Sequence, residues 1–227
     1  MAEKKVVGII GAMPSELADI REILGSGTTE IQEYSGFKFY INCVNEVKTV
    51  NVCCGIAKVN AAVCTQVLID RFSPEYIINA GIAGGMNNDV HVTDIVIADS
   101  VCPHDLDLKF LRNYPPYHDV FETDKELVQK AVKVCNELDV KSHIGRIVSG
   151  EIFLEDANLK KEICEKFNPH AVDMESAAVG HCCFLNKMPF VAIRCISDNA
   201  DNSAAMSFDQ FEKIAAKQVA TIVLSFF

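Results

Sequence analysis

The sequence contains 227 residues, 49% of them hydrophobic, which provides enough apolar surface for one sizeable core. Its 31 acidic and 21 basic residues give a net charge of -10, so the chain lacks the basic surface that a nucleic-acid-binding protein needs. The ten cysteines form no C-x-x-C pair, which favours buried free thiols in a reducing cytosol over a disulfide framework or a zinc site. The first apolar run is about six residues long, far short of the roughly 18 residues of a membrane span. We therefore expect a cytoplasmic protein with no nucleic-acid or membrane partner.

Short apolar segments alternate with longer amphipathic segments along the whole chain. The short segments are predicted strands, at 6–10, 37–44, 48–54, 76–79, 94–98, 143–149, 171–174 and 190–196. The longer segments are predicted helices, at 14–24, 58–71, 124–138, 156–167, 175–186 and 207–225. No linker or repeat divides the chain, so the pattern predicts one α/β domain over residues 1–227, with helices on both faces of a sheet.

One long segment, 102–123, fits neither pattern and contains Pro103, Pro115 and Pro116. Irregular segments of this length in compact domains are usually functional or mobile. We expect this segment to cover a substrate or to contact another subunit.

Three carboxylates stand at the ends of predicted strands. Glu16 follows the first strand, Glu175 lies in the tract 172–176, and Asp198 closes the tract 194–198. In α/β folds, ligands bind in the crevice beyond the carboxyl ends of the strands, so these side chains are expected to converge there as an acid/base site. A purely structural role is open for each of them, because Glu16 and Glu175 can complement a helix dipole and Asp198 can cap a turn or helix.

The order and spacing of several motifs resemble the 5'-methylthioadenosine/S-adenosylhomocysteine nucleosidases of the purine nucleoside phosphorylase superfamily. The motifs are 9–13 (IIGAM), 55–62 (GIAKVNAA), 79–85 (NAGIAGG), 148–153 (VSGEIF) and the two acidic tracts. The resemblance spans nearly the whole chain. It implies a single-domain, three-layer α/β/α fold with a central mixed β-sheet, a homodimer, an adenine nucleoside as substrate and no cofactor.

The resemblance also implies how the N-ribosidic bond is broken. Asp198 would protonate adenine N7, Ser197 would support Asp198, and Glu16 would activate water. Asp198 can hold a proton near neutral pH only if its surroundings raise its pKa well above the reference of about 3.9. Phosphorylases of the superfamily place basic residues near the first strand, and a carboxylate there favours water over phosphate. A phosphate-dependent purine nucleoside phosphorylase and a non-catalytic nucleoside-binding protein are the alternatives.

The residues implied to bind the substrate fall into three groups. The ribose would contact Glu175, Met174 and Asp173. The adenine would contact Phe153 by stacking, Leu154 through its backbone, and Ala83 and Gly84 in a glycine loop. The 5' group would lie against Met13, Ile56 and Phe208, with Phe110 reaching the pocket of the neighbouring subunit. On their own, Phe153 and the residues of the 5' group are more often ordinary core residues.

The chain departs from the family between residues 103 and 117, where many members carry Phe-Gly-Tyr and Gly-Gln-x-Pro-Gly. This difference leaves open whether the 5' group is that of methylthioadenosine, S-adenosylhomocysteine, 5'-deoxyadenosine or a futalosine-like nucleoside. The pairs His104-Asp105 and His118-Asp119 are typical of metal ligands, but loop His-Asp pairs are more often solvated or structural. The expected chemistry needs no metal, so we predict none.

Overall fold

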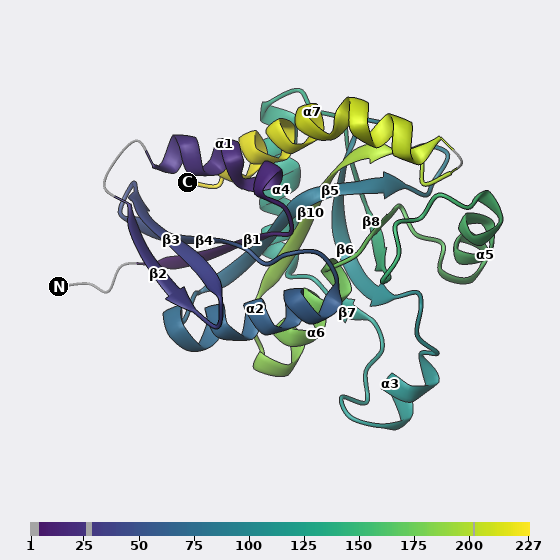
Figure 1. Ribbon diagram of the computed structural model, residues 1–227, viewed down its shortest axis with the longest axis horizontal. Helices are drawn as coiled ribbons and strands as arrows, with labels where there is room; N and C mark the ends of the chain where they lie inside the picture. The colour runs from purple at the N-terminus through teal and green to yellow at the C-terminus, as the bar shows by residue number, and fades with distance from the viewer. Residues whose placement is uncertain (1–4, 26–28, 202) are drawn as a thin grey trace.

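The computed structural model describes residues 5–25, 29–201 and 203–227, and Figure 1 shows its strands and helices. The strands are β1 (Val6–Gly11), β2 (Glu30–Tyr34), β3 (Phe37–Val44), β4 (Val47–Cys53), β5 (Tyr76–Gly85), β6 (Ile95–Pro103), β7 (Phe121–Glu122), β8 (Ser142–Ser149), β9 (Ala171–Asp173) and β10 (Phe190–Asp198). The helices are α1 (Pro14–Leu24), α2 (Lys58–Phe72), α3 (Lys109–Asn113), α4 (Lys125–Glu137), α5 (Ala157–Phe167), α6 (Ser176–Asn186) and α7 (Ala204–Leu224).

The strands form one mixed sheet that is open at one end and closed at the other. The open part runs β2-β3-β4-β1-β5, with β1 parallel to both β4 and β5. Beyond it, β5 pairs with β10 along one edge and with β9 at its last residues, and β10, β6, β8 and β9 complete a ring back to β5. This closure turns half of the sheet into a small barrel of five strands, in which β9 contributes two pairs to β5 and three to β8.

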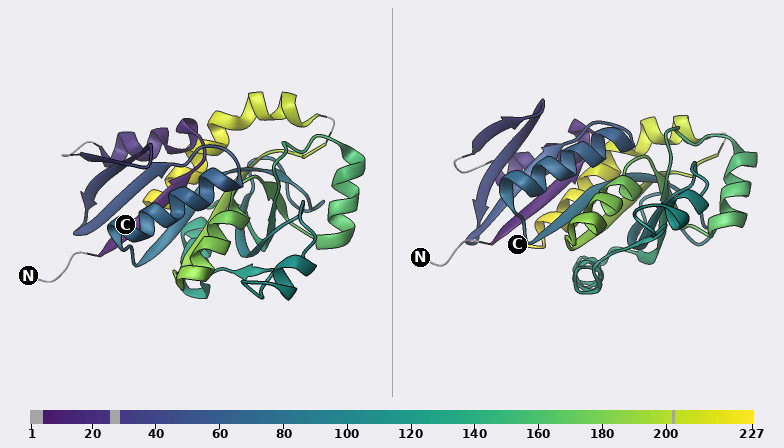
Figure 2. Two further views of the ribbon diagram at one scale, coloured as in Figure 1. Left: turned by 60° about the horizontal axis from the view of Figure 1, so that its bottom comes forward. Right: turned by 90° about the horizontal axis from the view of Figure 1, so that it is seen from below.

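Helices cover the sheet on both faces (Figures 1 and 2). On one face α2 and α6 lie side by side, and Leu68 and Val179 from these helices belong to one buried cluster. On the opposite face α1, α4 and α7 pack on the sheet through a second cluster, which includes Leu17, Ala131 and Val219. The predicted α/β class, with helices on both faces of a mixed sheet, is confirmed.

The predicted elements are confirmed with ends within three residues, except that β5 and β6 run six and five residues beyond their predicted ends, and four further corrections are needed. The sequence analysis missed β2, β7 and the five-residue helix α3, and the last two lie inside the segment 102–123. The predicted glycine loop around Ala83 and Gly84 is wrong, because β5 continues through both residues and pairs with β10 and β9. A Cβ atom at Gly84 would lie 2.8 Å from the Ala200 Cβ, so glycine here permits close approach within a strand rather than a loop.

Seven of the ten cysteines are buried free thiols. Burial raises the pKa of Cys102 to about 11 and that of Cys182 to about 11. Thiols in such surroundings are unreactive near neutral pH, as expected for residues that fill the core. None of the helices in the described ranges is long and apolar enough to cross a membrane.

Candidate active site

A cavity of about 120 Å³ lies beyond the carboxyl ends of β1, β5, β9 and β10. Glu16, Glu175 and Asp198 all line it, and their exposed fractions are 4%, 7% and 2%. The convergence predicted from the three strand ends is therefore present. The predicted site residues that line the cavity are Met13, Glu16, Ile56, Ala83, Gly84, Phe153, Asp173, Met174, Glu175, Ser197, Asp198 and Phe208.

Glu16 occupies the third position of α1, which begins with Pro14 as the helix-start interpretation predicted. Its carboxylate accepts hydrogen bonds from the backbone N–H groups of Ala12 (2.6 Å), Met13 (2.8 Å) and Ile82 (3.0 Å). Burial raises the pKa of Glu16, although the Arg194 charge and these hydrogen bonds oppose the shift. The side chain thus both caps the helix and presents a carboxylate of fixed orientation to the cavity.

Asp198 ends β10, where the apolar strand delivers it to a buried position. Its Oδ1 accepts the backbone N–H of Ala200 at 2.7 Å, and its Oδ2 accepts the Ser197 hydroxyl at 2.8 Å. Burial raises the pKa of Asp198, and these two hydrogen bonds offset only part of the shift. Asp198 therefore stabilises the turn after β10, as the capping alternative predicted, and retains the raised pKa that a proton donor needs.

Glu175 lies at the start of α6 and accepts the backbone N–H of Ala57 at 2.9 Å. Burial raises its pKa to about 7, and the negative charge of Asp173 adds to the shift. A carboxyl group with this pKa exists in both protonation states near neutral pH. It can accept or donate a hydrogen bond to a hydroxyl group in the cavity.

A buried polar network stands behind Glu175. Arg194 Nε donates a hydrogen bond to Asp173 Oδ2 at 2.9 Å, and Arg194 Nη2 forms an ion pair with the same oxygen at 2.9 Å. The hydroxyl groups of Ser149 and Ser176 also donate to Asp173. Arg194 also donates to the Asn79 side chain at 2.7 Å. Both oxygens of Asp173 are thus engaged within the protein, although the residue forms part of the cavity wall.

Arg194 is the functional residue that the sequence analysis missed. It is 2% exposed, and its charge lowers the pKa of both Glu16 and Glu175 against the effect of burial. The available signal was an arginine inside the apolar run 190–196, because a buried charge requires a partner and so indicates a polar network.

Apolar side chains form the rim of the cavity. Phe153 is 43% exposed and meets the ring of Phe208 edge to face, with centroids 5.5 Å apart. The alternative that Phe153 is an ordinary core residue is therefore wrong. Leu154, by contrast, is 4% exposed and lies in a small adjoining cavity of about 30 Å³. An aromatic face that remains open beside buried carboxyl groups can stack on a planar base.

No residue of the segment 102–123 lines this cavity within the chain. Phe110, on α3, is 50% exposed and does not line the cavity. The two His-Asp pairs do not share a site, because Asp105 is bound to Lys58 while Asp119 is bound to Arg112. Among the described residues, no group of three or more histidine, cysteine or acidic side chains is arranged to hold a metal ion.

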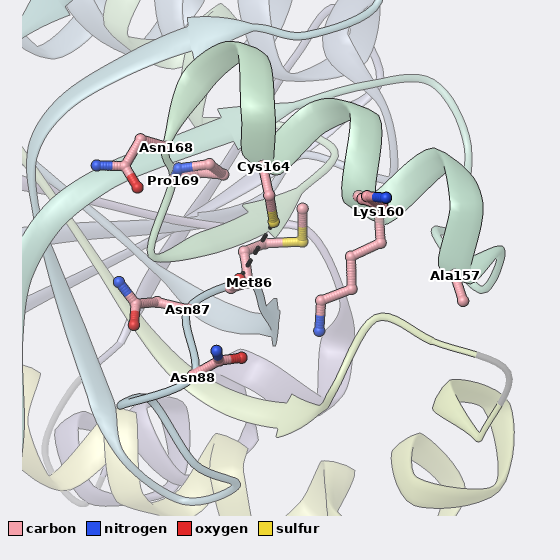
Figure 3. A pocket seen from close by; sticks show the side chains of 9 residues that line it. Met86, Asn87, Asn88, Ala157, Lys160, Cys164, Asn168 and Pro169 are labelled. Carbon is pink, nitrogen blue, oxygen red and sulfur yellow. Dashed lines mark hydrogen bonds between the residues drawn. The ribbon is translucent and has the colours of Figure 1, made fainter.

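A second pocket, of about 380 Å³, lies against α5 (Figure 3). Lys160 extends from α5 to the backbone carbonyl of Asn199 at 2.5 Å, and the Cys164 thiol donates to the carbonyl of Met86 at 3.2 Å. These contacts attach α5 to the ends of β10 and β5. Lys160 thus contacts the turn after Asp198, and none of the described residues that line this pocket lines the carboxylate cavity.

The sheet, its partial closure and the buried carboxyl groups define the class of protein, and the chain belongs to the Phosphorylase superfamily, whose family model matches residues 6–227. A 5'-methylthioadenosine/S-adenosylhomocysteine nucleosidase from Bacillus pumilus is 38% identical over 225 residues, covering 96% of this chain and 96% of that protein. At this level of identity the chain falls, within the superfamily, among the 5'-methylthioadenosine/S-adenosylhomocysteine nucleosidases.

Two solved structures extend the comparison. The nucleosidase from Neisseria meningitidis in complex with methylthio-immucillin-A superposes with a TM-score of 0.91 at 34% identity, covering 96% of each chain. Futalosine hydrolase of Helicobacter pylori superposes with a TM-score of 0.92 at 30% identity, covering 98% of this chain and 97% of that one.

Proposed function

We propose that this chain, as one domain over residues 1–227, hydrolyses the N-ribosidic bond of 5'-methylthioadenosine and S-adenosylhomocysteine. The products are adenine and the 5'-thioribose. The family supports the reaction class, and the cavity supplies an acid, a base and a ribose acceptor in one buried site. Adenine-releasing activity of this kind serves methionine salvage in the cytoplasm.

The carboxyl groups divide the chemistry between them. Protonated Asp198 donates its proton to adenine N7, which makes the base a better leaving group, while ionised Glu16 accepts a proton from the attacking water. The backbone N–H groups that hold Glu16 fix the direction of its free lone pairs. Glu175 accepts hydrogen bonds from the ribose hydroxyls, and these strengthen as positive charge develops on the ring.

One observation carries the choice of water over phosphate. Among the described residues that line the cavity, none is a lysine or an arginine, whereas four are acidic. The buried cation nearest this cluster, Arg194, is already paired with Asp173. Arg21, the first basic residue after the first strand, packs on Tyr40 instead. The uncompensated negative charge here would repel a phosphate anion but not a neutral water molecule.

The 5' side of the cavity supports a thioether substituent. Met13, Ile56 and Phe208 form an apolar wall, which suits a sulfur-containing arm better than a free 5'-hydroxyl group. The futalosine hydrolase neighbour makes a futalosine-like nucleoside the second candidate substrate.

A homodimer is also part of the proposal. An apolar depression of about 640 Å³ lies between α2, α6 and the segment 102–123, bordered by Val59 (73% exposed) and Leu185 (62% exposed). Exposed apolar patches of this kind mark interaction surfaces, and a second copy of the chain would cover this one. Phe110, exposed on the adjoining α3, would then reach the partner's 5' pocket.

The direct test is adenine release from 5'-methylthioadenosine by the purified protein, with and without phosphate, together with identification of the sugar. Free methylthioribose formed without phosphate supports hydrolysis. Strict dependence on phosphate, with a sugar 1-phosphate as product, would replace it with phosphorolysis. Tight binding of the nucleoside without adenine release would leave only a binding function.

A further inference from the structure

Three charged residues from separate segments form a closed ring beside the cavity. Lys58 begins α2, Asp105 follows β6, and Glu151 follows β8. The Lys58 ammonium group lies 2.5 Å from Asp105 Oδ1 and 3.8 Å from Glu151 Oε1. The ring is closed by two backbone donors, because the Lys58 N–H binds Glu151 Oε1 at 3.2 Å and the Glu151 N–H binds Asp105 Oδ2 at 2.9 Å.

The Lys58–Asp105 pair of the ring is less exposed than an ordinary surface ion pair, whereas Glu151 is 45% exposed. The side chains of Lys58 and Asp105 are 23% and 27% exposed, whereas the Lys109–Asp107 pair in the same segment is 61% and 52% exposed. Burial alone would raise the pKa of Asp105, but the hydrogen bonds from Lys58 and from the Glu151 backbone lower it overall. Asp105 is therefore ionised at neutral pH, and its contacts are screened less by solvent than those of Asp107.

The ring joins the two walls of the proposed substrate site. Ala57, directly before Lys58, donates its N–H to Glu175, and it does so with a φ of 83°, which is strained for a residue with a side chain. Phe153, the aromatic residue of the rim, lies two residues after Glu151. The separation of Glu175 from Phe153 thus depends on how firmly the two chain segments are held together.

We propose that Lys58 is a positioning residue, and that Lys58, Asp105 and Glu151 form a latch that holds the Phe153 segment against the Ala57–Glu175 contact. The inference rests on the proposed function and assigns a role to the His104-Asp105 motif that the chemistry itself does not use. Among the described residues, none of the three latch members lines the carboxylate cavity, so the latch acts on substrate binding through the residues it holds.

Replacement of Lys58 by Met tests the latch kinetically. A latch that positions the bound nucleoside equally before and during reaction affects KM more than kcat, so we expect KM for 5'-methylthioadenosine to rise about five-fold with kcat within two-fold. Asp105→Asn should give a similar rise, and the double variant should be no worse than either single variant, because both changes open the same ring. Lys133→Met, in the exposed Lys133–Glu137 pair of α4, should keep the wild-type KM.

The dependence on salt separates positioning from a general loss of stability. Lys58 and Glu151 also line the apolar depression proposed as the dimer contact, so the salt series is run with the oligomeric state held constant. Under that condition wild-type KM should rise with ionic strength as the ion pairs are screened, while KM of the Lys58→Met variant should respond much less. If the Lys58→Met variant releases adenine normally and has the wild-type KM and the wild-type salt response, the latch is overturned. If kcat and the melting temperature of Lys58→Met both fall, Lys58 acts in folding alone, and this result would also overturn the latch.

Hydrogen exchange provides a readout that does not need turnover. Asp105→Asn should accelerate exchange at residues 150–154, since the Glu151 N–H loses a charged acceptor, and Asp107→Asn should not. Unchanged exchange at 150–154 would refute the latch. A wild-type protein that releases no adenine would refute the proposed function instead, while the exchange measurement would still decide the latch.

Discussion

The floor and the rim of the cavity differ in polarity and in burial. The floor consists of carboxyl groups at strand ends, each buried and held by backbone donors or by the Arg194 network. The rim consists of apolar side chains on connecting segments, and Ile56 and Phe153 remain 50% and 43% exposed. Because the carboxyl groups of the floor are buried, removing a partner of any one of them costs a large free energy, whereas the rim side chains contribute contact area to a ligand. Under the proposed function, the floor carries bond cleavage and the rim carries nucleoside selection.

The largest expected effect is in the floor, at Asp198. Asp198→Asn keeps the shape and the acceptor for the Ala200 N–H but removes the proton that adenine N7 would receive. We expect kcat to fall by about 10²–10⁴-fold, as for loss of a general acid. Asp209→Asn, an exposed change on α7, is the matched control and should keep wild-type activity. Adenine release by Asp198→Asn at near the wild-type rate would remove the acid role.

Arg194→Met tests whether the floor depends on its buried cation. The change leaves Asp173 buried without its ion pair, so we expect the free energy of unfolding to drop by about 3–5 kcal/mol in urea titrations. Arg112→Met breaks an exposed pair with Asp119, and it should cost less than about 1 kcal/mol. Similar losses in the two variants would mean that the floor is no more sensitive to charge than the surface is.

Glu175→Gln tests the floor through the pH dependence of folding stability. The pKa of Glu175 is raised from 4.5 to about 7, so between these values the unfolded chain ionises while the folded chain keeps its proton. Wild-type stability contributed by this group is therefore complete below pH 4.5 and is lost as the pH rises through 7, a change of about 3 kcal/mol. The variant lacks this loss, so its melting temperature relative to wild type should increase from pH 5 to pH 8. A constant difference across this range would show that Glu175 does not titrate there.

The smallest of these effects is expected at the rim. Phe153→Ala removes the exposed ring that would stack on adenine, and stacking of a base on an aromatic side chain contributes about 1–3 kcal/mol. KM should therefore rise, while the free energy of unfolding should fall no more than on truncation of another partly exposed apolar side chain, because Phe153 is 43% exposed. Ile144→Ala, an exposed apolar residue on β8, controls for loss of surface area. A loss of stability without a change in KM would place Phe153 among structural residues.

Much of the local structure and part of the site could be predicted from the sequence. The helix predicted at 14–24 coincides with α1, since Pro14 and Glu16 are typical of a helix start and the apolar residues recur at helical spacing. Glu16, Glu175 and Asp198 could be predicted to converge because each stands where a strand ends in an alternating α/β pattern. These are local signals, which a few neighbouring residues are enough to produce.

Only the tertiary structure decided the features that depend on residues far apart in the chain. β9 has three residues and pairs with both β5 and β8, and its contacts close the barrel and turn the supposed glycine loop into the end of β5. The Arg194–Asp173 pair and the ring of Lys58, Asp105 and Glu151 likewise join segments that have no sequence relation. The physical reason is that strand pairing and the stability of a buried charge are set by partners brought near in space, whereas helix starts and strand ends are set by adjacent residues.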